Sequence, residues 1–500
     1  MQNQRQELET RKERTFMTRR TMLWLFALEL SIVQIHGAQQ DGWQSNSALG
    51  RQVLAAGRAH EAQRLFEQAL RTAEAIETVP GRRVFISTSD LGAAYQAQKK
   101  FAEAEALDRK ALEIARVAGI PDRELLPPLT NLAALLREMG RYAESESVYC
   151  RTLTIAEREM APYHAQTYRI LRELAFLSAA QGRPEEAEQD YLRALQPGES
   201  GEAIEADELV TTRSYLGDLY RKQGRYAESA AQYAQAMSLL EQASQKGRLR
   251  IGVLSRLGQL AADQGSFRRA ESLYRTALGE AQKTLGPENE QAAAILNNLG
   301  HLYTSKENYG RAKETLEQAR TMWEKLRLPE NPEFATLLNN LGAAYYHQRK
   351  YPAAELLYQR ALAIDKALLG TEHWSVARDL NNLGALYLDT RRPTEAELVL
   401  LESAASARRS ASPSPLLPQT LLNLAELYRK QERYEEAEDL YQRTAEAWES
   451  LLGPENPEFA RKLDLLATAY RGMAMYVQSG NLKSRAAAIR ASNAFQQLSK

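Results

Sequence analysis

The sequence lacks several features that mark common functional classes. It contains one cysteine, Cys150, so it cannot form an internal disulfide or a cysteine-based metal knuckle. We interpret Cys150 as a buried or half-buried thiol on a helix. The 64 lysines and arginines balance the 64 aspartates and glutamates, and no long run of one sign occurs. A binding site for the nucleic-acid phosphate backbone is therefore not expected.

Catalytic and cofactor motifs are lacking as well. The chain has no glycine-rich phosphate loop, no His-Glu-x-x-His and no Gly-x-Ser-x-Gly sequence. Its six histidines are scattered, without zinc-ligand spacing along any one helix. Acidic pairs such as Glu435-Glu436 fall at the starts of predicted helices, where they favour the helix dipole. We expect a non-catalytic protein with no metal and no cofactor.

The apolar run from Met22 to Ile35 is short for a membrane span, which needs about twenty residues, and Glu29 interrupts it. Basic residues precede the run, and Ala38 offers a cleavage point after it. We predict that residues 1–38 are a signal peptide or N-terminal anchor and that the protein is exported or periplasmic. The alternatives are membrane anchoring by residues 22–35 and a cytoplasmic protein whose leading helix packs on the folded part of the chain.

What the sequence does contain is a repeat. Leucine returns every 41 or 42 residues, at positions 49, 91, 132, 174, 216, 257, 299, 341, 383, 424 and 466. A period of this size indicates a supersecondary unit that cannot bury its apolar face alone and stacks on copies of itself. Positions within each copy are numbered by their offset from this reference leucine.

Residue size follows the same period. The residue at plus one is small and the residue at plus four is large in most copies, which places an apolar stripe on a first helix. An aromatic residue or leucine at plus seventeen then belongs to a second helix. At plus thirteen the first ten copies carry alanine or serine, where a bulkier side chain would push two helices apart: Ala62, Ala104, Ser145, Ala187, Ser229, Ala270, Ala312, Ala354, Ala396 and Ala437.

Turn signals separate these helices. Gly140, Gly182, Gly224 and Gly265 lie between the first and second helices, where glycine can adopt the left-handed conformation that ends a helix. Between repeats, Asn331-Pro332 and Asn456-Pro457 offer an N-cap followed by proline at the first helical position. Each repeat is therefore predicted to be a helical hairpin.

The order leucine, small residue, tyrosine, alanine and aromatic at these offsets resembles the tetratricopeptide repeat. Segments such as residues 296–300 and 351–373 resemble the longer subclass of kinesin light chains. The resemblance implies an all-α fold, a right-handed superhelical solenoid of about eleven helix-turn-helix repeats. We assign residues 39–478 to the solenoid and residues 479–500 to a C-terminal capping helix.

In such an array, the first helices line a concave groove that takes peptide segments of partner proteins. Residues at minus two, plus two, plus five and plus six are expected to point into it. The resemblance assigns peptide contact to the asparagines at minus two, and the groove is mildly basic at both ends, which favours a partner with acidic residues. The predicted groove residues are Asn297, His301, Asn339, Tyr346, His347, Arg378, Asn381, Arg221 and Arg429.

Two alternatives stay open. The second row of asparagines, at minus one, is placed to form hydrogen bonds between neighbouring hairpins; it comprises Asn298, Asn340, Asn382 and Asn423. The groove asparagines themselves can be ordinary solvated helix surface. In function, the alternative to a peptide-binding scaffold is a structural or assembly component of a cell-envelope complex that uses end or convex surfaces. Membrane contact is expected only through the N-terminal segment.

Overall fold

A computed structural model of the protein describes residues 42–77, 79–159, 165–196, 205–242, 247–328, 330–409 and 416–498. The described residues form helices joined by turns and contain no β-strand, which confirms the all-α prediction. The predicted signal peptide or anchor, residues 1–38, lies outside the described residues. No helix among the described segments is long and apolar enough to cross a membrane.

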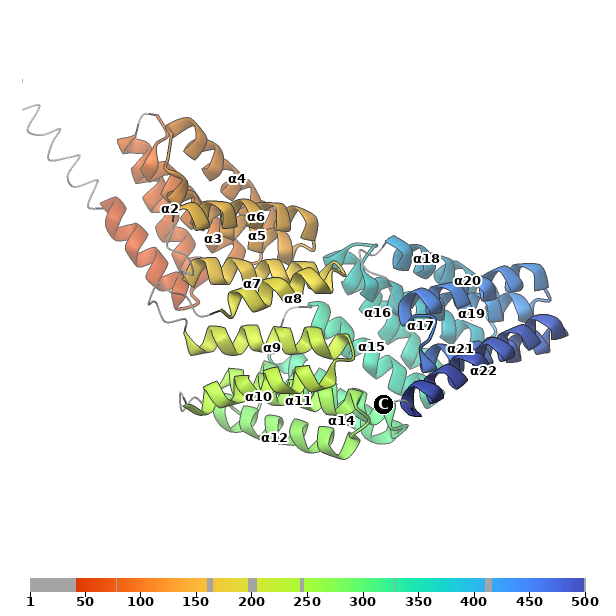
Figure 1. The fold of residues 1–500 in the computed structure, drawn as a ribbon. Helices are drawn as coiled ribbons and strands as arrows, with labels where there is room; N and C mark the ends of the chain where they lie inside the picture. The colour runs from red at the N-terminus through yellow and green to blue at the C-terminus, as the bar shows by residue number, and fades with distance from the viewer. Residues whose placement is uncertain are drawn as a thin grey trace, which may run out of the picture. The chain divides into compact units, whose positions relative to one another are not determined.

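The chain divides into two compact units, residues 1–170 and 171–500, and the division falls within α7 (Ala165–Ala180). In the first unit, residues 42–55 are helical and precede the remaining elements. These are α2 (Ala59–Ile76), α3 (Arg82–Ala97), α4 (Phe101–Ala118), η1 (Asp122–Leu125), α5 (Leu126–Glu138) and α6 (Tyr142–Glu159). Figure 1 shows both units, with most of their helices labelled.

The second unit continues the alternation of first and second helices. It contains α8 (Pro184–Ala194), α9 (Ala206–Lys222), α10 (Tyr226–Gln242), α11 (Arg248–Asp263), α12 (Phe267–Leu285), α13 (Glu290–Ser305), α14 (Tyr309–Lys325), α15 (Pro332–His347), α16 (Tyr351–Leu369), α17 (Trp374–Asp389), α18 (Pro393–Arg409), α19 (Leu416–Lys430), α20 (Tyr434–Leu452), α21 (Pro457–Gly472) and α22 (Tyr476–Leu498).

Helices pair in chain order, as the repeat predicts. Within one repeat α13 packs along α14 and α15 along α16, and between repeats α14 packs against α15. The first helices of neighbouring repeats also touch one another directly, in the series α9, α11, α13, α15, α17 and α19. A solenoid of stacked helical hairpins is thus confirmed, and within the second unit the first helices from α9 to α19 form one continuous row.

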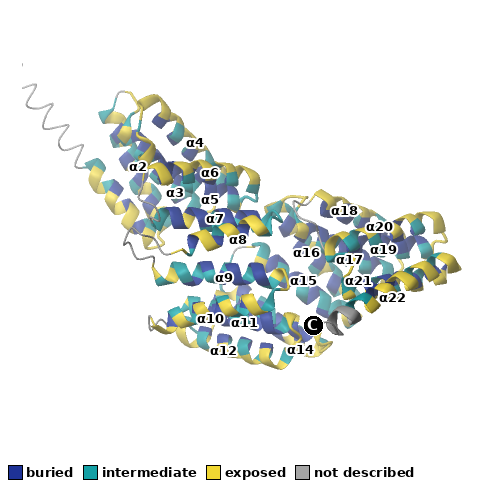
Figure 2. Ribbon diagram, in the orientation of Figure 1, coloured by how far each residue is buried: buried dark blue, intermediate teal, exposed yellow. Residues whose placement is uncertain are grey.

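Small residues allow the two helices of each hairpin to approach closely. All ten alanines and serines at plus thirteen have no exposed surface, which confirms the predicted seam. Where plus one is glycine, it lies under a ring or a leucine at plus seventeen in every copy except the second, in which Gly92 lies against Asp108. A Cβ atom added at Gly342 would stand 2.7 Å from the ring of Tyr358, and one added at Gly217 would stand 2.5 Å from the ring of Tyr233. Figure 2 shows the buried residues running along the helices.

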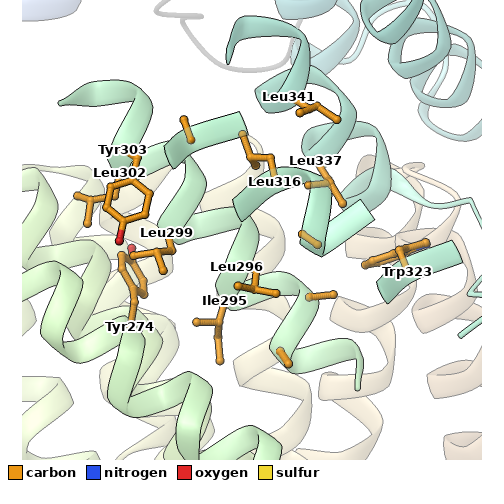
Figure 3. Close-up of a cluster of buried hydrophobic side chains, with 14 of the residues drawn as sticks. Tyr274, Ile295, Leu296, Leu299, Leu302, Tyr303, Leu316, Trp323, Leu337 and Leu341 are labelled. Carbon is orange, nitrogen blue, oxygen red and sulfur yellow. The ribbon is translucent and has the colours of Figure 1, made fainter. Parts of the chain in front are cut away.

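The reference leucines form most of the core between helices. Nine of them are buried: Leu91, Leu132, Leu174, Leu216, Leu299, Leu341, Leu383, Leu424 and Leu466. Figure 3 shows Leu299 and Leu341 in one cluster with Tyr274, Leu316 and Trp323. Leu257 is half-buried, and Leu49 is 46% exposed, so the first copy departs from the pattern at the leucine itself.

The turn predictions are confirmed. Gly140, Gly182, Gly224 and Gly265 have φ values of 74°, 76°, 75° and 71°. In other repeats the same offset carries a residue with a side chain in the same left-handed conformation: Lys99, Glu307, Arg349, Arg391, Glu432 and Ala474. The Asn331 and Asn456 side chains cap α15 and α21, accepting hydrogen bonds from the backbone amides of Phe334 and Glu458.

A polar clasp that the repeat pattern alone does not reveal joins the turn within one repeat to the second helix of the preceding repeat. Arg392 donates to Glu355 of the preceding repeat at 2.8 Å and to Glu395 of its own repeat. Its guanidinium lies 4.2 Å from the centre of the Tyr387 ring, and the Tyr387 hydroxyl donates to Glu355 at 3.0 Å. Equivalent clasps are built around Arg225 and Arg433. Solvent screens such partly exposed pairs, so each contributes little, but they recur along the array.

Two further predictions concern the burial of Cys150 on α6 and the start of the C-terminal helix, α22. Cys150 is exposed, so the prediction of a buried or half-buried thiol is wrong. It follows Tyr149, which occupies the buried plus-seventeen position, and therefore points away from the core. At the other end, α22 begins at Tyr476, three residues before the predicted capping helix, and packs along α21. Ser479 lies at plus thirteen of the eleventh copy and donates to the Ala467 carbonyl at 2.7 Å.

The left-handed turn supports a prediction about Gly224. Replacing it with alanine introduces a Cβ into a conformation with φ of 75°, so the free energy of unfolding should fall by about 1–2 kcal/mol. Gly279, in the middle of α12, has nothing within 4 Å of an added Cβ. Alanine there should raise the free energy of unfolding by about 0.5–1 kcal/mol. Urea denaturation followed by circular dichroism measures both values. Effects of equal sign would contradict the left-handed conformation of Gly224 and the helical conformation of Gly279.

Candidate functional site

A groove on the row of first helices is centred on α9, α11 and α13. It encloses a pocket of about 360 Å³. Its lining residues come from all three helices: Asp218, Arg221, Lys222, Ile251, Gly252, Ser255, Arg256, Gln259, Gln291, Ala294, Ile295 and Asn298. Many of them lie at minus two, plus two, plus five or plus six from a reference leucine, which are the offsets expected to face the groove.

The pocket exists because two neighbouring side chains are small. Gly252 and Ala294 occupy the minus-five position of α11 and α13, where other repeats carry Arg169, Thr336 or Arg378. A Cβ added at Gly252 would meet only the Nη1 atom of Arg256, at 3.3 Å. Glycine inside a helix costs about 1 kcal/mol relative to alanine, and the packing here does not require it. Such a glycine is typical of a place where something approaches the backbone closely.

Charged side chains form the rim. Arg256 Nε lies 2.9 Å from Asp218 Oδ2, and the other carboxylate oxygen of Asp218 accepts from Tyr233. Arg221 Nη1 lies 2.5 Å from Asp263 Oδ2. Lys222 is exposed beside them. With these pairs formed, Lys222 leaves the rim with a small positive excess.

His301 is exposed at the end of α13, yet the surrounding protein desolvates its ring and lowers its pKa. Asp263 of α11 acts electrostatically on this ring and also pairs with Arg221, so His301 lies near the charged rim. His301 and Arg221 are therefore the predicted groove residues that belong with the pocket region, Arg221 as part of its lining.

The predicted asparagines are placed differently. Asn339 and Asn381 are only 4% and 6% exposed, so the prediction that they point into an open groove is corrected. Asn339 donates to Asp379 Oδ1 at 2.6 Å and accepts from Asn382 at 3.1 Å. Asn381 accepts from Asn423 at 2.9 Å. The Asn339 amide is engaged through both its donor and its acceptor, and the Asn381 oxygen accepts within the array, so neither asparagine is an open groove contact.

These bonds form a ladder between first helices. In each step the residue at minus one donates to the residue at minus two of the preceding repeat. The four steps are Asn298 to Ser255 at 3.2 Å, Asn340 to Asn297 at 2.9 Å, Asn382 to Asn339 and Asn423 to Asn381. The alternative interpretation of the second asparagine row, hydrogen bonding between neighbouring hairpins, is confirmed. Asn297 is half-buried and takes part in the same ladder.

The remaining predicted residues lie along the row and are not brought to the pocket. The Arg378 side chain is 15% exposed and pairs with Asp379. The Tyr346 hydroxyl donates to Asp389 at 2.6 Å, and the exposed His347 ring stacks on Tyr309 at 4.6 Å.

Arg429, farther along at α19, pairs with Glu426 of its own helix at 2.8 Å. Among the side chains that the structure describes, no group of three His, Cys, Asp or Glu residues is placed to hold a metal ion.

Comparisons with known proteins identify the same repeat that the sequence pattern predicts. The family model described as tetratricopeptide repeat matches residues 43–116, 83–158, 124–196, 166–242, 249–325, 333–409 and 416–492, and a second model of the same description matches residues 297–367. "Tetratricopeptide repeat protein 19, mitochondrial" of Homo sapiens is 31% identical over 131 residues, which is 26% of this chain and 33% of that protein. The chain thus spans about a third of the length of the curated relatives it matches.

Two solved structures are also similar. BtubC (BKLC) from P. vanneervenii is 25% identical, with a TM-score of 0.37, over 50% of this chain and 94% of that chain. A putative kinesin light chain of Podosopora anserina, with nearly identical TPR-like repeats, is 22% identical, with a TM-score of 0.35, over 40% of this chain and 96% of that chain.

The ladder supports a prediction about Asn382. Replacing it with alanine removes the donor to Asn339 and leaves a buried amide oxygen unpaired, so the free energy of unfolding should fall by about 1–3 kcal/mol. Ser305 is exposed on α13, and its replacement by alanine should change the value by less than about 0.5 kcal/mol. Urea denaturation measures both, and equal effects would mean that the ladder contributes nothing.

Proposed function

The chain belongs to the tetratricopeptide repeat family, whose members generally act as protein–protein interaction scaffolds, and we propose that it binds a segment of a partner polypeptide in the groove of α9, α11 and α13. The protein acts by holding its partner and catalyses no reaction. The observation that carries the proposal is the pocket above Gly252, which no packing requirement of the fold explains.

The chemistry of the groove suits an extended peptide. Gln259 and Gln291 offer both donors and acceptors to a peptide backbone, independent of its sequence. Lys222 gives the rim its positive excess, which favours a partner with some acidic residues. An exposed ion pair contributes about 1 kcal/mol or less, so charge steers the encounter more than it holds the complex.

The proposed binding site is not the one predicted from the sequence, which was centred on the asparagines of α13, α15 and α17. The row of Asn339 and Asn381, together with Arg378, is occupied by bonds within the protein. The groove of α9, α11 and α13 lies toward the N-terminal side of that row, and Arg221 is the predicted groove residue that lines it. A partner would contact side chains of three successive repeats rather than a ladder of asparagine amides.

A second function has its own support. The second helices α16 and α18 expose three leucines, Leu356 at 69%, Leu398 at 70% and Leu401 at 51%. Leu356 and Leu398 share the plus-fifteen offset of adjacent repeats. Exposed apolar side chains in a cluster favour a protein contact. They support the alternative that the protein is an assembly component, for instance of a cell-envelope complex, and uses its outer surface.

Export remains part of the proposal. The basic residues, the apolar run at 22–35 and Ala38 support a secretory signal, and Cys150 creates no folding problem in an oxidising compartment.

The pocket is tested by changing Gly252 alone. Random peptides displayed on phage are selected on the immobilised wild-type protein, and the affinity of the selected peptides is then measured for two variants. Gly252→Gln fills the pocket and should weaken binding at least about tenfold, equivalent to about 1.4 kcal/mol. Gly252→Ala adds one carbon 3.3 Å from the end of the Arg256 side chain, which has to move by only a few tenths of an ångström. This variant should therefore retain binding and raise the free energy of unfolding by up to about 1 kcal/mol.

Two results would count against this site. Undiminished binding to a folded Gly252→Gln variant would reject the groove. If that binding were lost instead in Leu398→Glu, the outer surface would be the docking site and the second function would be favoured.

The signal is tested on the protein isolated from its native source. N-terminal sequencing should show a mature chain that begins after residue 38, because a signal peptidase cleaves after a small residue such as Ala38. A chain that keeps residues 22–35 would contradict cleavage and leave the anchor as the alternative.

A further inference from the structure

Two buried aspartates distinguish one junction in the array. Asp365, on α16, lies at plus twenty-four of its repeat, where the two preceding repeats carry Ala281 and Trp323. Asp379, on α17, lies at minus four of the next repeat, where the two preceding repeats carry Ile295 and Leu337. Neither aspartate has any exposed surface. An ionisable residue in such a position is costly unless it is paired, so its presence calls for an explanation.

The hydrogen bonds satisfy only half of the oxygens. Arg378 Nε and Nη2 donate to Asp379 Oδ1 at 3.0 and 2.9 Å, and Asn339 Nδ2 donates to the same oxygen at 2.6 Å. Arg378 Nη2 also reaches Asp365 Oδ2 at 3.4 Å. Asp365 Oδ1 and Asp379 Oδ2 are buried and receive no hydrogen bond from the protein. Three helices, α15, α16 and α17, thus meet at this cluster.

The local charge does not balance without one more positive charge. Two carboxylates face one guanidinium, and Glu333 of α15 adds a further negative field at Asp365. Tyr358 of α16 is kept neutral because burial raises the pKa of its hydroxyl. His373, the N-cap of α17, is also kept neutral, because burial and the nearby Arg378 lower the pKa of its ring. Arg378 is the cation that acts on the pair, and no cluster of three potential metal ligands is found among the described residues.

A proton bound by one of the two carboxylates supplies the missing positive charge without needing any additional space. Burial and the field of Asp379 raise the pKa of the Asp365 carboxyl to about 7, and each of the two carboxyl groups has one buried oxygen without a hydrogen-bond partner. Burial raises the pKa of Asp379 as well, against the opposing effect of Arg378.

We propose that Asp365 and Asp379 share one proton and that this proton locks the junction of the two repeats formed by α15, α16 and α17. Protonated Asp365 donates to Asp379, while Arg378 and Asn339 hold Asp379 from the other side. Asn339 also accepts from Asn382 in the asparagine ladder, so the locked cluster is joined to the contact between first helices.

The direction of the pH effect follows from linkage. In the closed junction Asp365 has a pKa of about 7, whereas in an opened junction its pKa returns toward the ordinary 3.8. The stabilising contribution is therefore fully present below about pH 4 and is lost as the pH rises toward about 7. In that window opening releases about one proton, so the equilibrium constant for opening increases about tenfold per pH unit and becomes constant above neutral pH.

Hydrogen–deuterium exchange of the full-length protein tests the lock. Exchange of peptides from α15, α16 and α17 is measured from pH 5 to pH 8.5 and corrected for the intrinsic exchange rate. In the wild type the opening constant of these segments should increase about tenfold per pH unit up to about pH 7, relative to peptides from α12. A junction whose protection follows α12 across the whole range would overturn the proposal.

Two variants separate the lock from general effects of charge. Asp365→Asn keeps the shape of the protonated carboxyl and a donor toward Asp379. It should abolish the pH dependence and protect the junction at least tenfold more than the wild type at pH 8. Asp439→Asn removes a carboxylate that is exposed on α20 and paired with Arg443, and it should leave the pH dependence unchanged.

If Asp365→Asn kept the wild-type dependence, or if a sodium or potassium salt at constant ionic strength changed the protection instead of pH, the shared proton would be excluded. This proposal does not depend on the groove, since neither the lock nor its test involves a partner.

Discussion

The structure depends on how closely the two helices of each repeat approach. At plus one a glycine or alanine is the rule, and most of the glycines lie under a ring or a leucine at plus seventeen; at plus thirteen an alanine or serine has no exposed surface. Adding one carbon at Gly342 would bring it to 2.7 Å from the Tyr358 ring, closer than real contacts allow. Because this approach is fixed in nearly every copy, successive hairpins present the same faces, and the first helices stack into one row. Closely packed interiors resist deformation, so the row of first helices has a fixed surface.

The groove and the junction lock follow from that row, but for different reasons. Between repeats, the asparagine ladder and the outer arginine clasps hold first helices and turns in register. At the first step of the ladder, which ends on Ser255, the neighbouring residues Gly252 and Ala294 are small and leave room for a pocket. Where the ladder includes Asn339, two buried aspartates replace apolar residues. The pocket at Gly252 and the pair of buried aspartates are therefore two local departures from the repeat. Each arises from one or two residues that differ from those at the same offset in other repeats.

Much of the fold could be predicted from the sequence because the signal is periodic. The left-handed glycines, the asparagine caps and the small-residue seam are each set by neighbours within one hairpin, and all were confirmed. The candidate site was harder to predict, since it depends on the rotation of one repeat against the next. A change of one position on a helix turns a side chain by about 100°, and this decides whether Asn339 faces a groove or a neighbouring helix. Gly252 did carry a signal, as a glycine at an offset where other repeats have long side chains. Asp365 carried one as well, as an ionisable residue at an offset where the two preceding repeats have alanine and tryptophan.

The proposed function requires that a partner polypeptide lies across α9, α11 and α13. Photo-crosslinking tests it most directly, with a selected peptide that carries a benzophenone side chain and with the adducts located by mass spectrometry. We expect adducts on α9, α11 and α13 around Gly252, and competition by the unlabelled peptide. Adducts concentrated on α16 and α18, around Leu356 and Leu398, would contradict it.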